Sequence, residues 1–375
     1  MDEFLSNHWG YPMAPQGEPP SGFSALEASL APESCAACHS EQHKQWRESL
    51  HSHTMGPGIR WQLQLMNPEA SRSCLKCHAP LTEQFALHAR ERGWSKSKAA
   101  RPEHVPADLH RKGLACAACH VRRHQRFGPP AKSETVNRTV HGGFTEHKAF
   151  GDSRFCATCH QFPEDGSRLN GKLREDTYNQ WRQSRFAAEG RSCQSCHMPE
   201  RRHEWKGIHD PEMTRSALSV QFTSSGEESG TQRVSATVSN SGAGHHFPTY
   251  LVPDVQLVLE YLMPSGEVNE LARHTLAWRA NLALTEEQFD QRLPAGKSVK
   301  LQGRLPTSQA EGNLRLRVSV APKHQYLVTY EDYLARKGDT LDEKTLGLLQ
   351  LAIQEARSSQ YDFVAAEQSL GLIAK

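Results

Sequence analysis

The sequence is poor in the residues that normally build a protein core. Hydrophobic residues make up 37% of its 375 positions and aromatic residues 7%, whereas apolar residues amount to about 45–50% of an ordinary globular domain. No run of about 18 apolar residues occurs, so we expect no membrane-spanning helix. The first residues, Met1-Asp-Glu-Phe-Leu-Ser, also lack the basic and apolar regions of a secretory signal.

The chain also lacks a large net charge of either sign. Lys and Arg number 44 against 42 Asp and Glu, which gives a net charge of +2. A chain with this balance creates no strong positive field. The sequence therefore gives no reason to expect nucleic acid or an anionic membrane as a partner.

Cysteine is absent everywhere except in one repeated pentapeptide. The ten cysteines all lie in five copies of Cys-x-x-Cys-His: Cys35, Cys38 and His39; Cys74, Cys77 and His78; Cys116, Cys119 and His120; Cys156, Cys159 and His160; Cys193, Cys196 and His197. This spacing is typical of c-type haem attachment, in which the two thiols become thioethers and the histidine becomes the proximal iron ligand. The sequence therefore predicts five covalently attached haems.

Zinc sites and disulfides are the alternatives for paired cysteines. Zinc fingers do not require a histidine directly after every second cysteine, and disulfide frameworks do not repeat one spacing. Attachment of haem to such motifs takes place outside the cytoplasm. We therefore expect a periplasmic or extracellular protein whose signal is missing from this numbering.

The composition changes along the chain and indicates a multidomain protein. Residues 1–33 are rich in Pro and Gly and predict an extended arm over the surface, or a disordered leader. Residues 34–212 carry the motifs, with about 35 residues per haem, and predict a pentahaem domain of short helices and loops without strands. Residues 213–322 predict a β-domain, and residues 323–375 a C-terminal helical segment.

Two patterns support the last two assignments. Alternation such as Val255/Leu257/Leu259/Tyr261 has the period of half-buried antiparallel strands, and short strands of this kind predict an immunoglobulin-like β-sandwich. Thr340-Leu-Asp-Glu343 resembles a capping box, followed by an apolar stripe at helical spacing up to Ala356. We expect this helix to dock on its own protein; the alternative is a partner-binding helix.

The iron position opposite each proximal histidine needs a second ligand. Sixteen histidines lie outside the motifs, against seven methionines in the whole chain, which favours bis-histidine ligation for most haems. Met55, Met66 and Met198 lie near motifs and are the alternative kind of ligand. The local sequence favours five histidines as distal ligands: His51, His141, His203, His209 and His245.

Several stretches resemble one family. Trp46-x-x-Ser49-x-His51, Cys193-Gln-Ser-Cys196-His197-Met198-Pro199, the segment from His203 to Asp210 and Gly242-Ala-Gly-His245-His246-Phe-Pro-Thr249 are similar to multihaem cytochromes c of the cytochrome c-554 and hydroxylamine-oxidoreductase-related superfamily, in a pentahaem form with a C-terminal β-domain. The resemblance implies closely packed haems for electron hopping, with distal ligands at His51, His209 and His245. It also shows one departure, because Trp181-Arg-Gln-Ser184-Arg-Phe186 carries Phe where the first copy has His51.

Two functions are therefore expected to compete. The first is a protein that carries single electrons between redox partner proteins. This interpretation assigns no catalytic residues, and it leaves open that the protein assembles with copies of itself. The second is a haem enzyme that reduces or oxidises a small nitrogen or sulfur oxide at one five-coordinate haem. The carrier is favoured because no catalytic constellation is recognisable in the sequence.

Overall fold

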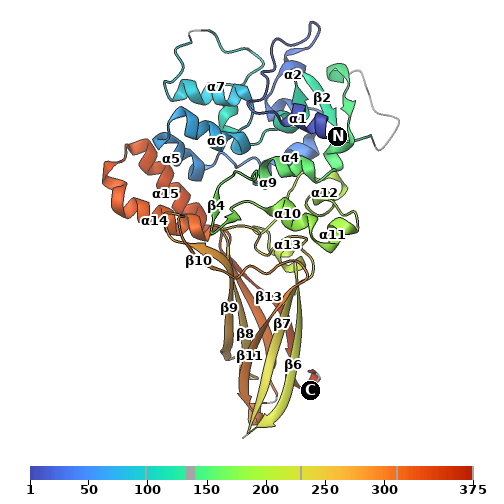
Figure 1. The fold of residues 1–375 in the computed structure, drawn as a ribbon, viewed down its shortest axis with the longest axis vertical. Helices are drawn as coiled ribbons and strands as arrows, with labels where there is room; N and C mark the ends of the chain where they lie inside the picture. Colours follow the sequence, from blue (N-terminus) through green and yellow to red (C-terminus); the bar gives the residue numbers. More distant parts are fainter. Residues whose placement is uncertain (98, 132–139, 229, 310, 374–375) are drawn as a thin grey trace. The chain divides into compact units, whose positions relative to one another are not determined.

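The computed structural model describes residues 1–375 apart from 98, 132–139, 229, 310 and 374–375 (Figure 1). By its internal contacts the chain forms two compact units. The unit that holds all ten cysteines, called the motif unit below, comprises Met1–Cys159, Arg191–Trp205 and Asp339–Ala352. The other, called the sheet unit, comprises His160–Gly190, Lys206–Gly338 and Ile353–Lys375.

The motif unit is built mainly of short helices joined by loops, as the sequence predicts. Its described α-helices are α1 (Asp2–Trp9), α2 (Ala25–Ala28), α3 (Pro32–Ala36), α4 (Ser40–Glu48), α5 (Pro57–Leu65), α6 (Pro68–His78), α7 (Thr82–Glu91), α8 (Cys116–His120), α12 (Cys193–His197), most of α9 (Arg154–His160) and the first part of α15 (Glu343–Ser358). The 3-10 turns described in this unit are η1 (Leu109–Arg111), η2 (Val140–Gly142), η3 (Lys148–Gly151), η4 (Pro199–Arg201) and most of η6 (Gly338–Thr340).

The expectation that the motif-bearing region contains no strand is wrong. β1 (Val121–Arg122), β2 (Gln125–Gly128) and β3 (Thr145–Glu146) form a small sheet. β1 and β2 are joined by Arg123 and His124, both with positive φ, which is the backbone of a tight hairpin turn. The usual Asn-Gly signal for such a turn is missing, so local sequence does not predict this hairpin.

Residues 1–33 are not merely an arm lying over the surface. They contain α1 and α2, and Ser24 and Glu27 form a capping box at the start of α2. Met13 and Leu30 are 4% and 1% exposed and belong to one apolar cluster with Leu81 and Val105. The segment therefore contributes to the core of the motif unit, which the absence of a periodic pattern concealed.

The sheet unit contains two larger antiparallel sheets. One has the strand order β10-β9-β8-β12-β13 and the other β11-β7-β6. The strands are β6 (Leu218–Glu228), β7 (Thr231–Asn240), β8 (Asp254–Leu262), β9 (Val268–Ala280), β10 (Glu287–Asp290), β11 (Ser298–Pro306), β12 (Asn313–Ala321) and β13 (Tyr361–Ser369). The antiparallel strands expected from the alternating pattern are present.

One apolar core lies between these two sheets. Leu314, Leu316 and Val318 of β12 alternate with less buried residues, and they share a cluster with Val234 of β7 and Leu301 of β11. Because successive side chains of a strand point to opposite faces, this alternation buries one face of each sheet. The immunoglobulin-like topology stays a prediction.

The unit also contains smaller elements. These are a two-stranded ribbon of β4 (Arg168–Leu169) and β5 (Lys172–Leu173), and the helices α10 (Thr177–Arg182), α11 (Arg185–Ala188), α13 (Pro211–Ser216) and α14 (His324–Lys337).

The C-terminal segment is helical only in part. α14 and α15 (Glu343–Ser358) are followed by β13, which pairs with β12. The predicted capping position is wrong by two residues, because the Asp342 carboxylate, not Thr340, accepts from the Thr345 amide (3.0 Å). The predicted stripe of α15 is buried, with Leu349 at 0% exposure.

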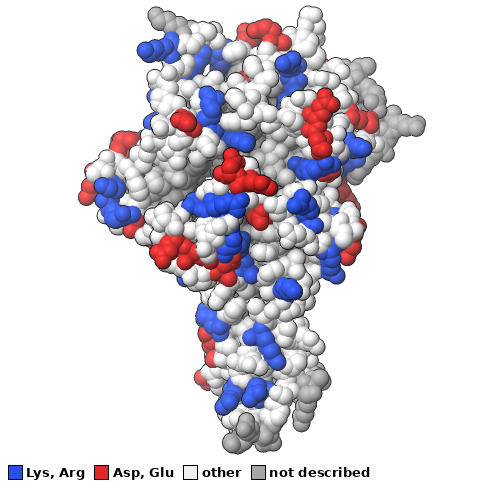
Figure 2. Space-filling model, viewed as in Figure 1, with Lys and Arg blue, Asp and Glu red and all other residues white. Residues whose placement is uncertain are grey.

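The surface carries both charges. On the face seen in Figure 2, Lys and Arg are interspersed with Asp and Glu, as the near-zero net charge leads one to expect. Of the helices that the structure describes, none has the length and apolar character needed to cross a membrane.

Candidate haem-attachment sites

Each Cys-x-x-Cys-His motif is held by a short helix. In four motifs the histidine is the last residue of the helix, namely His78 of α6, His120 of α8, His160 of α9 and His197 of α12; in the first, His39 is the N-cap of α4. One helical turn places residues i, i+3 and i+4 on one face, so both thiols and the imidazole lie together. All ten cysteines are free thiols, as thioether formation requires.

The proximal imidazoles also have the orientation that iron ligation needs. The Nδ1–H of His78 donates to the Thr54 carbonyl (2.7 Å), and that of His120 donates to the Phe127 carbonyl (2.8 Å). Metal-ligating histidines commonly anchor one ring nitrogen in this way and present the other to the metal. Here Nε2 is presented, so these residues fit a proximal role.

Three of the five predicted distal ligands share this orientation. The Nδ1–H of His141 donates to the Gly143 carbonyl, that of His203 to the Arg201 carbonyl and that of His245 to the His246 carbonyl, each at 2.9 Å. Each Nε2 is thereby directed away from the local backbone. This geometry is what the expected distal role requires.

His203 faces the proximal histidine of the third motif. The ring centroids of His120 and His203 lie 6.1 Å apart. Two imidazoles on opposite sides of one iron have centroids about 6 Å apart, because each iron–nitrogen bond is about 2 Å long. Both rings anchor Nδ1 on a carbonyl, so this pair fits the two axial positions of one haem.

His39 and His141 lie in the same neighbourhood. Burial, followed by the neighbouring His141, lowers the pKa of His39. Burial also lowers the pKa of His203 to about 4, with smaller contributions from His120 and His39. The first and third motifs and two predicted distal ligands thus gather in one part of the motif unit.

Cysteines of different motifs lie near one another. The thiols of Cys35 and Cys116, of Cys77 and Cys159, and of Cys156 and Cys193 are close enough for one partner to shift the pKa of the other. Cys119 lies close enough to Cys156 and Cys159 to raise the pKa of both thiols, after the larger effects of their thiol partners and of burial. The motifs are therefore neighbours in space in an order that differs from their order in the sequence.

His51 is fixed by the turn that follows α4. The Trp46 indole donates to the Leu114 carbonyl (2.8 Å), and the Ser49 hydroxyl donates to the Trp46 carbonyl (2.7 Å). The His51 ring packs edge-on against Trp205, with centroids 4.5 Å apart. The Trp-x-x-Ser element thus forms a rigid turn that presents His51.

The second Trp-x-x-Ser element repeats this turn in the sheet unit. The Ser184 hydroxyl donates to the Trp181 carbonyl (2.7 Å), as in the first copy. Phe186, which replaces the histidine, is 5% exposed and packs beside Gly244, directly before His245. The departure from the first copy therefore serves to pack the loop that carries His245.

His209 and His245 both belong to the sheet unit. Burial lowers the pKa of His209 to about 4, with a smaller contribution from Lys323. Their role as distal ligands stays a prediction.

Sequence reasoning overlooked several histidines. His8 is 3% exposed and bonds through Nε2 to the Cys119 carbonyl (2.8 Å), although it lies in a segment without a periodic pattern. His53 anchors Nδ1 on the Ser49 carbonyl (2.9 Å), as the predicted ligands do, but it is exposed. His88 and His110 are buried beside a pocket described below.

The basic residues between the motifs mostly have protein partners. Arg111 pairs with Glu91, and Lys112 pairs with Glu33. Arg122 donates to several backbone carbonyls around α8, including Ala118. These side chains are therefore engaged within the protein.

The sequence matches no protein-family model and no curated protein. A penta-heme cytochrome c552 from Thermochromatium tepidum has a similar structure, with a TM-score of 0.58, 17% identity, and coverage of 91% of this chain and 98% of that one. The putative ApaA protein from Bordetella pertussis matches with a TM-score of 0.18 and 14% identity over 28% of this chain and 76% of its own. The latter score is too low to carry an argument.

At the level of fold, the chain is thus similar to a multihaem c-type cytochrome. Its own ten free cysteines and oriented imidazoles fit that fold's cofactor. The particular superfamily stays a prediction.

Proposed function

We propose that this chain is an extracytoplasmic pentahaem c-type cytochrome that transfers single electrons between redox partner proteins through mainly bis-histidine haems. The observation that carries the proposal is the closeness of cysteines that belong to different motifs. Thiols that lie near one another bring each attachment point beside the next. A chain of adjacent attachment points is what a carrier needs, whereas an enzyme with one reactive haem does not require it.

The residues divide into attachment and axial roles. The ten motif cysteines would hold the haems covalently, and the five motif histidines would be proximal ligands. Bound haem supplies one-electron exchange at iron, and two histidine ligands keep the iron six-coordinate. His203 is the proposed distal ligand opposite His120, and His141 is proposed for the haem of His39.

The closeness of these thiols supports an order of motifs for electron flow. The first motif neighbours the third through Cys35 and Cys116, and the third neighbours the fourth through Cys119 and Cys156. The fourth also neighbours the fifth through Cys193 and the second through Cys77 and Cys159. The fourth motif is thus proposed as a branch point.

Substitution His203→Ala tests the axial assignment. We expect one of five haems to change from low to high spin in the electron paramagnetic resonance spectrum, because the iron of His120 would lose its sixth ligand. The haem count by pyridine haemochrome should stay at five, since attachment uses other residues. His274→Ala, in β9, is the matched control and should leave the spectrum unchanged; an unchanged spectrum in His203→Ala itself would refute the assignment.

One observation favours the second candidate function, an enzyme that acts on a small nitrogen or sulfur oxide. Among the residues that the structure describes, no imidazole lies against His78 as His203 lies against His120. The second motif is therefore the candidate for an open haem.

Ligand binding distinguishes the two functions. An open haem would bind nitric oxide, cyanide or nitrite in the reduced protein and shift part of the Soret band. If none of these probes changes the spectrum, the enzymatic function is excluded and the electron-carrier function is the one that remains.

A further inference from the structure

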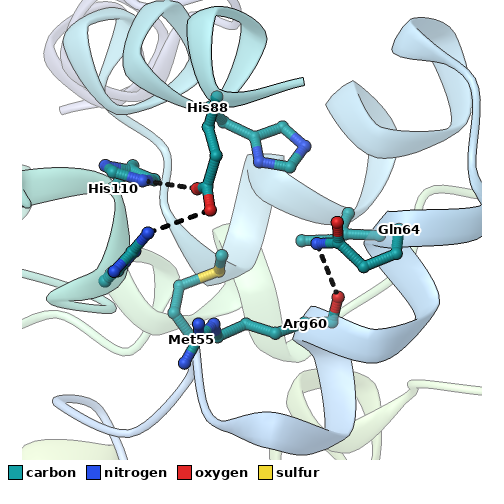
Figure 3. A pocket seen from close by; sticks show the side chains of 8 residues that line it. Met55, Arg60, Gln64, His88 and His110 are labelled. Atoms are coloured by element: carbon teal, nitrogen blue, oxygen red, sulfur yellow. Dashed lines mark hydrogen bonds and ion pairs between the residues drawn. The ribbon is translucent and has the colours of Figure 1, made fainter. Parts of the chain in front are cut away.

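A small pocket in the motif unit is lined by residues that no haem motif uses (Figure 3). Arg60 of α5 lies on one side, and His88 of α7 and His110 of η1 lie on the other. Met55 and Leu63, which also line the pocket, belong to an apolar cluster against which Cys74 packs. The pocket therefore borders the second motif.

Positive charge in this pocket is only partly balanced. The Glu91 carboxylate accepts from Arg111 (2.9 Å), Lys344 (2.9 Å) and His110 (2.8 Å). The guanidinium of Arg60, in contrast, has no hydrogen bond or ion pair with any residue that the structure describes. Burial, followed by the nearby Arg111, lowers the pKa of Arg60, and Glu91 opposes this by a smaller effect. Arg60 thus lies near Arg111 and near a carboxylate that three other groups already share.

A second group in the pocket also lacks a partner. His88 is 3% exposed, and among the described residues its Nε2 finds nothing to hydrogen-bond to. A buried polar atom without a partner is unfavourable, so native structures normally satisfy it with protein, water or ligand. With its proton on Nε2, the His88 imidazole would donate to the same kind of acceptor that the Arg60 guanidinium needs.

We propose that this pocket binds a carboxylate or another small oxyanion, held by the Arg60 guanidinium and the His88 imidazole. An oxyanion offers acceptors to both groups and supplies the negative charge that Arg60 and Arg111 require. The planar guanidinium matches the two oxygens of a carboxylate. Chloride, which has no such geometry, fits less well.

Two sources can supply this chemistry. One is a propionate of the haem attached at the second motif, which borders the pocket; this source rests on the proposed haem attachment. The other is a free oxyanion, which does not depend on it. A haem count for every sample separates failure of attachment from failure of the anion site.

The experiment compares the full-length, haem-loaded protein with Arg60→Gln, Arg60→Lys and Arg47→Gln. Arg47 is exposed on α4 and lies outside the pocket, so its substitution makes the same change of charge elsewhere. Acetate, nitrite and inorganic phosphate are titrated separately by calorimetry, and the midpoint potentials of the haems are measured by redox titration.

A free oxyanion would give saturable binding to the wild type that Arg60→Gln weakens at least ten-fold, while Arg47→Gln leaves it unchanged. A propionate would give no saturable binding, but Arg60→Gln would lower the midpoint potential of one haem, because a cation that favours the reduced state is lost. Arg60→Lys should partly restore either property. If Arg60→Gln changes neither anion binding nor any potential, the proposal is overturned.

Labelling of wild-type Arg60 with phenylglyoxal, mapped by mass spectrometry, keeps the test valid if Arg60→Gln does not fold. Because Arg60 is partly buried and Arg47 is exposed, each residue is compared with itself under the different conditions. A propionate would leave Arg60 unlabelled with or without added anion, and a free oxyanion would protect it only after acetate, nitrite or phosphate is added, while Arg47 is labelled throughout. Labelling of Arg60 that proceeds without added anion and that none of the three anions lowers would also overturn the proposal.

Discussion

At the scale of single residues, the histidines differ in which ring nitrogen is anchored. Nδ1 of His120 and His203 donates to a backbone carbonyl, so Nε2 is left for iron. His110 and His124 are instead tied through Nε2, to the Glu91 carboxylate and the Gly17 carbonyl respectively. The anchoring therefore distinguishes His120 and His203 from His110 and His124, although the exposed His53 is also anchored through Nδ1.

Close packing at one glycine supports the loop of His245. A Cβ added at Gly244 would lie 3.1 Å from Trp181 Cδ1, 3.2 Å from the Ser184 hydroxyl and 3.3 Å from Phe186 Cδ2. These groups belong to the second Trp-x-x-Ser turn and to the side chain packed behind it. None of them can move without disturbing that turn.

Substitution Gly244→Ala is therefore expected to destabilise the sheet unit. Overpacking of this kind typically costs about 1–3 kcal/mol in free energy of unfolding. Thermal unfolding followed by circular dichroism measures the change. Gly207→Ala, where an added Cβ meets nothing within 4 Å, is the control and should change the midpoint little; equal midpoints for the two variants would argue against the packing role of Gly244.

At the scale of elements, the motif helices are short and depend on their ends. α8 and α12 have five residues each, which is far below the length at which an isolated helix is stable in water. α6 is longer and has a defined start, because the Asn67 side chain accepts from the Ala70 amide (2.8 Å) and Pro68 occupies the first turn. This cap fixes where the helix of the second motif begins.

Removal of this cap by Asn67→Ala should lower the free energy of unfolding by about 1 kcal/mol, because the Ala70 amide loses its acceptor. The midpoint of urea unfolding, followed by helical circular dichroism, reports the loss. Asn67→Ser keeps an acceptor oxygen and should retain most of the stability. A midpoint in Asn67→Ala as high as in wild type would show that the cap does not limit the stability of α6.

At the scale of the whole molecule, the two units differ in how they are stabilised. The sheet unit has one apolar cluster that draws on both of its larger sheets. The apolar clusters around the motif helices, such as that of Met55, Leu63, Leu75 and Ala79, are smaller. A unit with little apolar core and several covalent cofactors is expected to depend on those cofactors for folding.

Chain produced without haem attachment should therefore fold in part. Amides of β8 and β12 should remain protected from hydrogen exchange, whereas those of α6 and α8 should exchange freely. Hydrogen exchange measured by mass spectrometry on loaded and haem-free chain provides the comparison. Protection of α6 in the haem-free chain would contradict the dependence on the cofactor.

Local patterns predicted much of this protein because their causes are local. The Cys-x-x-Cys-His spacing depends on one helical turn, and the alternation in β8 and β12 depends on the two faces of a strand. The hairpin at Arg123 and His124, the strand β13 and the buried N-terminal segment escaped prediction. In these cases distant contacts, not local preference, decide the conformation.

The sequence by itself determined where haem can attach, because each attachment site is complete within five residues. Only the tertiary structure decided which sites are neighbours, since Cys35 lies near Cys116, and His120 faces His203, across some eighty residues of chain. It alone also brought Arg60, His88 and His110 to one pocket. Contacts between residues so far apart in the sequence depend on the path of the whole chain, and local sequence patterns do not predict them.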